Sequence, residues 1–332
     1  MNRTQIHKLP KVELHCHLDG SVPINLLKEM ALEQGMDQKI MDSVRAPEDC
    51  EDLEDYLSCF DVILSVLQTE KNLMRAVYAV IEEAHKENVR YLELRFAPLL
   101  HLAKDLTPKQ AITAVSEGVV KAKEDFPIHV NILVCALRKD SEEENMQLFE
   151  AVHELKATYV VGIDVAGDEA RYPNECVEKS VRYAGENHFQ ITMHSGECGC
   201  ARNVLTAMHL GATRIGHGVA IQNDPAVLKE VKDRNVLLEM CPTSNVQTRA
   251  VKSWADYPLR FFLDQGVPVS INTDNRTVSN TTLTDEFMLC VKHCQLTKQE
   301  MKIILLDSVQ HSFATEQIKK EITKQIDIQF AQ

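Results

Sequence analysis

Glycine and proline are scarce in this sequence, with 12 and 11 residues among 332. This composition excludes linker-rich and low-complexity proteins. Long apolar runs are also lacking, because no stretch approaches the ~20 consecutive apolar residues that cross a bilayer. The N-terminal residues contain neither the apolar region nor the small-residue cleavage site of a secretory signal. We therefore expect a cytoplasmic protein that has no membrane partner.

Basic side chains are in deficit, because 36 Lys and Arg residues stand against 49 Asp and Glu residues and give a formal net charge of -13. Such a field repels DNA and RNA, so we expect no nucleic-acid partner. A small neutral or cationic ligand is easier to accommodate. The 10 cysteines form no paired metal motif and are expected to be reduced thiols. No feature of the sequence specifies an oligomeric state.

Eight short runs rich in β-branched residues alternate with amphipathic segments of helical period. They cover residues 12–17, 89–98, 128–137, 159–167, 190–196, 213–218, 236–242 and 267–274. This alternation predicts parallel strands joined by helical crossovers, and eight units favour one (β/α)8 barrel of the TIM type over residues 1–332. An open dinucleotide-binding sheet is the weaker interpretation, because the first run is not followed by G-x-G-x-x-G.

Two regions exceed what a simple barrel requires. Residues 24–88 separate the first two predicted strands and contain several helical segments, including residues 52–68, so we expect a helical insertion that caps one end of the sheet. After the last predicted strand, residues 283–306 have the pattern of two further helices. The polar tail, residues 315–332, is predicted to form a final helix.

The stretch VELHCHLDGS places His15 and His17 two positions apart at the end of an apolar run. Alternate residues of a strand project to the same face, so the two imidazoles are expected to lie side by side. Two charged imidazoles would repel each other, whereas two neutral ones can share a cation. The motif alone does not decide between a metal site and coincidence.

Polar residues with useful chemistry recur at the C-terminal ends of the predicted strands, where a parallel barrel builds its active site. Each has an ordinary structural explanation when taken alone, as a core histidine, a helix cap or a first-turn acid. The set is His15, His17, His194, Glu197, His217, Asp274 and Asn275. Histidines that serve only to fill the core would be expected at either end of the strands, and not at the C-terminal end each time.

Three imidazoles and one carboxylate at these strand ends fit a single Zn²⁺ site that keeps an open position for water. The expected ligands are His15, His17, His194 and Asp274. Glu197 follows His194 closely enough to face the site without binding the metal, which suits a proton donor to the substrate. His217 could hold or deprotonate the attacking water.

The motifs ELHCHLDGS, GIDVAGDE, MHSGE, RIGHG, CPTSN and NTD carry a family resemblance over essentially the whole chain. Their order and spacing are similar to those of the adenosine deaminase family of the amidohydrolase superfamily. The resemblance implies a barrel with one divalent metal, normally zinc, held by the four ligands named above. It also implies hydroxide attack on C6 of a purine nucleoside and loss of ammonia to leave inosine.

The resemblance implies further roles at the site. Glu197 would protonate purine N1, and His217 would lie beside the attacking water. Gly167 would offer its backbone N–H to purine N3, and Asp19 would bind ribose hydroxyls. Because relatives that act on the free base have Glu at the position of Asp19, this residue favours a nucleoside substrate, with 2′-deoxyadenosine also accepted.

Asn275 departs from the family pattern, in which a second Asp follows the metal-binding Asp and contacts purine N7. An amide carries donor hydrogens at any pH, so adenine binding should survive the change. The change raises the chance that a modified purine nucleoside is the substrate, and an enzyme that acts on free adenine at the same metal site stays open as a separate alternative. A non-catalytic metal-binding protein on the same barrel is a third, weakened by the presence of all four ligands together with Glu197 and His217.

Overall fold

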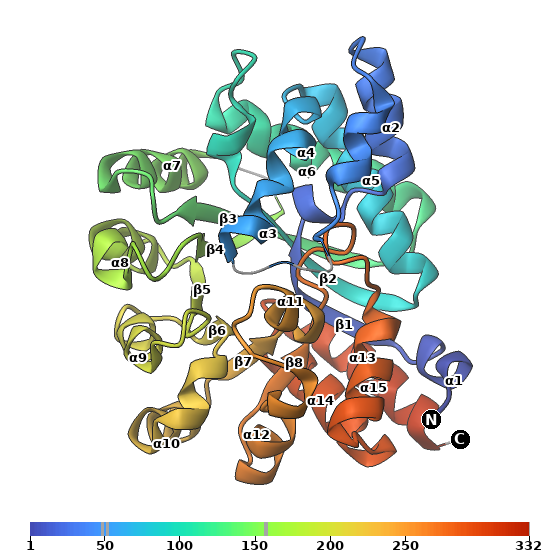
Figure 1. Cartoon of the computed structure of the whole chain (residues 1–332), viewed down its shortest axis with the longest axis vertical. Helices are drawn as coiled ribbons and strands as arrows, with labels where there is room; N and C mark the ends of the chain where they lie inside the picture. The colour runs from blue at the N-terminus through green and yellow to red at the C-terminus, as the bar shows by residue number, and fades with distance from the viewer. Residues whose placement is uncertain (48–49, 51–52, 156–158, 332) are drawn as a thin grey trace.

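The computed structural model describes residues 1–47, 50, 53–155 and 159–331. Eight parallel strands pair in chain order, from β1 to β8, around its centre (Figure 1). Their bounds are β1 Lys11–His17, β2 Val89–Phe96, β3 His129–Leu137, β4 Val160–Ala166, β5 Gln190–Ser195, β6 Arg214–His217, β7 Leu237–Met240 and β8 Val269–Ile271. Each strand lies within the run that predicts it or differs from it by a residue at its start.

The two outer strands of this order meet just beyond the end of β8. Asp274 forms a parallel bridge with Cys16, and its backbone N–H donates to the carbonyl of His15 at 3.0 Å. The N–H of His17 donates in turn to the carbonyl of Asp274 at 2.7 Å. The sheet therefore curls into a nearly closed barrel, and the predicted (β/α)8 architecture is confirmed.

Helices surround the strands, as Figure 1 shows. Those of the outer ring are α5 Glu70–Lys86, α6 Pro108–Asp125, α7 Glu142–Glu154, α8 Glu178–Glu186, α9 Ala201–His209, α10 Pro225–Asp233, α12 Leu259–Gln265 and α14 Lys298–His311. Several begin with strong local signals. The side chains of Thr107, Ser141 and Asp224 each accept a backbone N–H of the first turn, and proline opens α6 and α10.

The predicted insertion between β1 and β2 is present and has two parts. α2 Ile24–Glu33, the 3₁₀ helix Gln38–Ser43, α3 Leu53–Ser58 and α4 Phe60–Val66 come first. Side chains of α3 and α4 line the same cavity as residues from the C-terminal ends of the strands, so this part caps the barrel there. The last helix of the insertion, α5, packs beside α6 and β2 as a barrel helix. Position 52 of the predicted helical segment lies outside the described residues.

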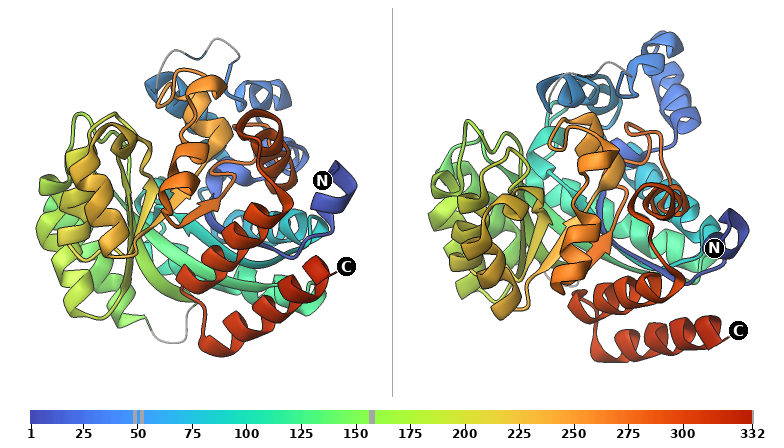
Figure 2. Two further views of the ribbon diagram at one scale, coloured as in Figure 1. Left: turned by 90° about the horizontal axis from the view of Figure 1, so that it is seen from below. Right: turned by 60° about the horizontal axis from the view of Figure 1, so that its bottom comes forward.

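The C-terminal region forms the expected helices α13 Leu283–Cys294, α14 and α15 Glu316–Ala331. α14 contacts β7, β8 and β1, and α15 packs on the outer side of α14, as both views of Figure 2 show. Position 332 lies outside the described residues. The remaining helices are short, namely α1 Arg3–His7, α11 Pro242–Gln247 and the 3₁₀ helices Asp19–Ser21, Pro98–His101, Asn174–Val177, Val219–Asn223 and Trp254–Asp256. Within the described part of the chain, no helix combines the length and apolar character needed to cross a membrane.

Candidate metal centre and active site

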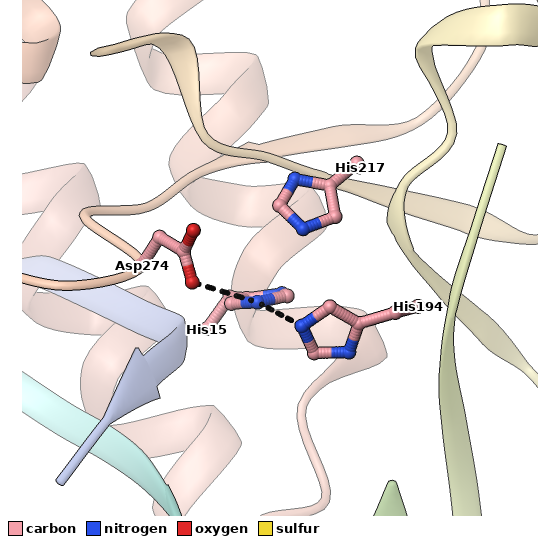
Figure 3. Close-up of side chains that lie close together, drawn as sticks. All are labelled: His15, His194, His217 and Asp274. Atoms are coloured by element: carbon pink, nitrogen blue, oxygen red, sulfur yellow. Dashed lines mark hydrogen bonds and ion pairs between the residues drawn. The ribbon is translucent and has the colours of Figure 1, made fainter. Parts of the chain in front are cut away.

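Four side-chain donor atoms meet where β1, β5 and β8 end. His15 Nε2 lies 3.1 Å from His194 Nε2 and 3.3 Å from Asp274 Oδ1. His17 Nε2 lies 3.2 Å from the same His194 atom and 3.4 Å from the same Asp274 oxygen. The four atoms therefore form a closed ring, and the structure brings together all four residues predicted as ligands. Figure 3 shows three of them converging, with His217 beside them.

Two buried carboxylates set the tautomers of His15 and His194. The Nδ1 atom of His15 lies 2.8 Å from Glu239, and that of His194 lies 3.0 Å from Asp164. A carboxylate accepts, so each Nδ1 carries a hydrogen and each ring turns Nε2 inward. In their neutral forms the two rings would face each other with Nε2 lone pairs 3.1 Å apart, which repel unless a positive charge lies close to both.

The electrostatics of the cluster favour the metal-binding forms of His17, His194 and Asp274. Burial lowers the pKa of His194 and holds that of His17 well below its usual value, so both rings are neutral at pH 7. For His15, burial and Arg95 lower the pKa, but Asp274 and Glu239 outweigh them and leave it raised. Burial opposes ionisation of Asp274, yet His15 and the other imidazoles hold its pKa well below the usual range.

Four separations between these donor atoms are close to the distance between neighbouring ligand atoms around a small divalent metal. Around Zn²⁺ with ligands at about 2.0–2.1 Å, neighbouring ligand atoms of a tetrahedron are about 3.3–3.4 Å apart. The four observed separations run from 3.1 to 3.4 Å. Neutral imidazoles with one carboxylate suit Zn²⁺, and also Co²⁺ or Fe²⁺. The residues present therefore fit a metal ion.

His217 ends β6 and lies against the same cluster. A ligand atom from His217 lies within 4.8 Å of the corresponding atoms of His15, His194 and Asp274. The Asn245 amide donates to His217 Nδ1 at 2.9 Å, and the hydroxyl of Tyr257 donates to the other end of that amide. Because Nδ1 accepts, the proton of the neutral ring lies on Nε2, which is 3.6 Å from Glu197.

Both His217 and Asp274 adopt left-handed backbone conformations, with φ of 65° and 61°. Such conformations are uncommon for residues other than glycine and concentrate at functional sites, where surrounding contacts hold them. For Asp274, the contacts are the two backbone hydrogen bonds that join it to β1. The two residues with this uncommon backbone conformation therefore both direct their side chains toward the donor-atom cluster.

Glu197 follows β5 and faces the cluster from one side. Burial, followed by the charges of Asp274 and Glu169, raises its pKa to about 8. Thr248 donates to one of its oxygens at 3.4 Å. At neutral pH the group therefore holds its proton in a position next to His217.

A cavity of about 410 Å³ opens above the cluster. Its floor includes His17, His194, Glu197, His217 and Asp274, and its apolar wall comes largely from α3 and α4, with Leu53, Tyr56, Leu57, Phe60 and Leu64. The three residues predicted to contact substrate, Asp19, Gly167 and Asn275, all line the same cavity. Its size suits a small organic molecule.

Asp19, Gly167 and Asn275 differ in the groups that they present to the cavity. Burial raises the pKa of Asp19 to about 6, which leaves a carboxylate at neutral pH that can accept hydrogen bonds. Gly167 has φ of +103°, a conformation that favours glycine and leaves its backbone close to the cavity. Asn275 packs over Gly20, where a Cβ would collide with the Asn275 carboxamide. Among the described residues, Asn275 Oδ1 is buried without a hydrogen-bond partner.

Several residues that shape this site are absent from the sequence prediction. They are Asp164, Glu239 and Asn245, which orient histidines, and the buried cations Arg95 and Arg214, which pair with those carboxylates and with Glu93. The sequence does point to Asp164 and Glu239, because each lies inside an apolar predicted strand. A carboxylate that is buried there requires a charged or hydrogen-bonding partner. Asn245 lies in the CPTSN motif, which carried the resemblance without an assigned role.

Comparisons with known proteins agree over nearly the whole chain. A family profile described as adenosine deaminase matches residues 10–329. An adenosine deaminase of Enterococcus faecalis is 43% identical over 332 residues, covering 98% of each chain. The structure of an adenine deaminase from Arthrobacter aurescens has a TM-score of 0.90 at 25% identity, covering 98% of this chain and 100% of that one. A zinc-bound amidohydrolase from Burkholderia ambifaria has a TM-score of 0.89 at 25% identity, covering 99% and 95%.

Proposed function

The chain belongs to the adenosine deaminase family, and from that premise we propose that it hydrolyses adenosine to inosine and ammonia, a reaction of purine salvage. We expect 2′-deoxyadenosine to react as well. The observation that carries the proposal is that the carboxyl group of Glu197, whose pKa burial raises to about 8, lines one cavity together with His17, His194 and Asp274. Buried thiols at Cys135 and Cys290 support the cytoplasmic location that we also propose.

We propose Zn²⁺ as the cofactor, one ion per chain, with His15, His17, His194 and Asp274 as its ligands. The short separations among their donor atoms and the carboxylates behind His15 and His194 support this assignment. When bound, Zn²⁺ lowers the pKa of a coordinated water toward neutrality and so provides a nucleophile.

Glu197 is the proposed general acid. Addition of water at C6 of the purine is aided when a proton reaches ring N1, because the ring then carries no excess negative charge. A carboxyl group with a pKa of about 8 still holds a proton at neutral pH and can deliver it. Thr248 and the loop backbone hold the group in place.

His217 is proposed to orient the attacking water. Its Nδ1 accepts from Asn245, so its Nε2–H is available as a donor on the cavity side. Burial holds its pKa well below the usual value, and the ring is therefore neutral. A neutral donor can fix the position of an oxygen without placing a second positive charge beside the metal.

Three residues are proposed to hold the nucleoside. Asp19 would accept hydrogen bonds from ribose hydroxyls, and the backbone N–H of Gly167 would donate to purine N3. The Asn275 amide would donate to purine N7. All three line the cavity that contains Glu197, which supports their assignment to one ligand.

A second candidate is deamination of free adenine or of a modified adenine nucleoside at the same metal site. Asn275 favours the modified nucleoside, because this residue stands where the family pattern has an aspartate beside the purine. The similarity to the Arthrobacter aurescens adenine deaminase structure is a further reason to test it.

A substrate panel separates the candidates. Adenosine, 2′-deoxyadenosine, adenine, adenosine monophosphate and N6-methyladenosine are offered to the zinc-loaded protein, and conversion is followed by ultraviolet absorbance. We expect kcat/KM to be highest for adenosine, with 2′-deoxyadenosine within about tenfold. Higher kcat/KM for adenine or for the N6-methyl nucleoside would replace the first proposal with the second. No conversion of any member by metal-loaded protein would contradict both.

A further inference from the structure

One carboxylate outside the predicted site holds the loop that carries Glu197. Glu169 follows β4 and is 3% exposed. One of its oxygens accepts the N–H of Gly196 at 2.6 Å. The other accepts the N–H groups of Glu197 at 2.9 Å and Cys198 at 3.2 Å. Three consecutive backbone donors after β5 therefore converge on a single side chain from the neighbouring strand.

The shape of this loop explains why a carboxylate is needed. Gly196 has φ of +74°, and this left-handed turn directs successive N–H groups to the same side. A Cβ at Gly196 would also collide with Val204, so glycine is required there. Buried N–H groups without a partner are costly, and an ionised acceptor forms stronger hydrogen bonds than a neutral one. A neutral amide in place of Glu169 could accept through one oxygen only.

The negative charge of Glu169 is balanced within the same region. Arg138, which is 1% exposed and follows β3, attracts Glu169 electrostatically. The Arg138 guanidinium also donates to the carbonyl of His194 and to Asn174 at 2.6 Å. The ends of β3, β4 and β5 are thus tied together by one cation and one anion next to a proposed metal ligand.

We propose that Glu169 is a positioning residue that sets where Glu197 stands relative to a bound purine. Glu169 lies two residues after Gly167, so the backbone proposed to contact purine N3 and the loop proposed to protonate N1 are joined by three hydrogen bonds. The inference rests on the proposed function and extends it to a residue that touches no substrate atom. A displacement of about 1 Å of a reacting group can cost about 10²-fold in rate.

The test compares Glu169→Gln with a matched control, Glu142→Gln. Glu142 also accepts two consecutive backbone N–H groups, those of Lys179 at 2.5 Å and Ser180 at 3.2 Å, but at the start of the peripheral helix α8. Both variants lose a carboxylate that satisfies a backbone turn. Only Glu169→Gln should affect the loop after β5.

For adenosine, we expect Glu169→Gln to lower kcat by about 10²-fold, with KM within about threefold and metal content unchanged. We expect kcat of Glu142→Gln to stay within about twofold of the unsubstituted protein. Amide hydrogen exchange in a peptide covering residues 196–198 should be faster in Glu169→Gln and unchanged in Glu142→Gln. Wild-type kcat in folded Glu169→Gln, or equal losses in both variants, would overturn the proposal.

Glu169→Asp covers the case in which the amide variant does not fold. It keeps the charge but reaches one methylene less far, so kcat should lie between those of the unsubstituted protein and Glu169→Gln. A wild-type kcat in Glu169→Asp together with faster exchange in residues 196–198 would overturn the positioning role. If the unsubstituted protein deaminates no member of the panel, the proposed function fails. Hydrogen exchange would still show whether Glu169 holds the loop.

Discussion

The Nε2 atoms of His15 and His194 lie 3.1 Å apart, although 179 positions separate the two residues in the chain. Each ring donates from Nδ1 to its own buried carboxylate, Glu239 for His15 and Asp164 for His194. If both rings are neutral, their inward Nε2 lone pairs repel each other at this distance unless a positive charge lies close to both. The barrel therefore holds both Nε2 atoms in positions where they can share a cation, and this arrangement underlies the predictions on zinc binding below.

His17→Ala should lose most of its zinc, because it removes one of the four proposed donor atoms. His17 Nε2 lies 3.2 Å from the donor atom of His194 and 3.4 Å from that of Asp274. Elemental analysis of the purified variant measures this directly. His217→Ala is the matched control, since the proposed ligand set does not include it. We expect it to keep zinc while losing activity. Full zinc occupancy in His17→Ala would show that the ligand set is wrong.

Glu197→Gln should keep metal and substrate binding while kcat falls by roughly 10²-fold or more, as expected when a general acid is lost. The amide preserves the shape of the side chain but has no acidic proton to deliver at neutral pH. Steady-state kinetics with adenosine, together with metal content, separate the effect from misfolding. A kcat close to that of the unsubstituted protein would reject the role assigned to Glu197.

The activity of the unsubstituted protein should fall as pH rises through about 8. Burial and the nearby charges raise the pKa of Glu197 to about 8, so the protonated donor is present below this pH and is lost above it. The measurement is kcat against pH from about 5 to 10. The residual activity of Glu197→Gln should lack this alkaline limb. An alkaline limb that persists in the variant would assign it to another group.

Asn275→Asp should make kcat/KM for adenosine decline with rising pH more steeply than in the unsubstituted protein. An amide donates to purine N7 at every pH, whereas a carboxyl group donates only when protonated. The pH profile of kcat/KM for both proteins measures the difference. With 7-deazaadenosine, which lacks N7, the two profiles should coincide. Identical profiles with adenosine would show that residue 275 does not touch the purine.

Glu239→Gln should lower the free energy of unfolding by about 3–5 kcal/mol and weaken zinc binding by about 10–100-fold. Glu239 pairs with Arg95 at 2.8 Å and Arg214 at 2.7 Å and orients His15, so its loss leaves buried cations short of a partner. Chemical denaturation and zinc titration measure the two effects. Glu93→Gln is the control. Its partners are Arg214, Tyr91 and a backbone N–H, so it should lose stability without losing zinc affinity.

Local sequence patterns were sufficient to predict the barrel. β-Branched runs define the eight strands, and helix caps such as Thr107 and Asp224 place the starts of the helices between them. The same patterns predicted the insertion and the C-terminal helices. They also indicated that His15, His194 and Asp274 would share one end of the barrel, because parallel strands bring their C-terminal ends to one face. Their roles as ligands stay predictions.

Local sequence patterns could not predict the hydrogen bonds that orient these histidines. Glu239 lies 224 positions from His15, and Asn245 lies 28 positions from His217, and each pair forms across different strands or loops. Glu169 and the loop it holds are a third case, separated by 27 to 29 positions.

The sequence by itself determined which residues are strands, helices and strand-end polar groups, because hydrophobic period and capping act over a few neighbouring positions. Only the tertiary structure decided which carboxylate faces which imidazole, which proton each ring keeps and which side chain holds Glu197. Those choices depend on strand register, on the rotation of side chains inside a closed barrel and on the burial of charge, all of which exist only once distant segments have packed together.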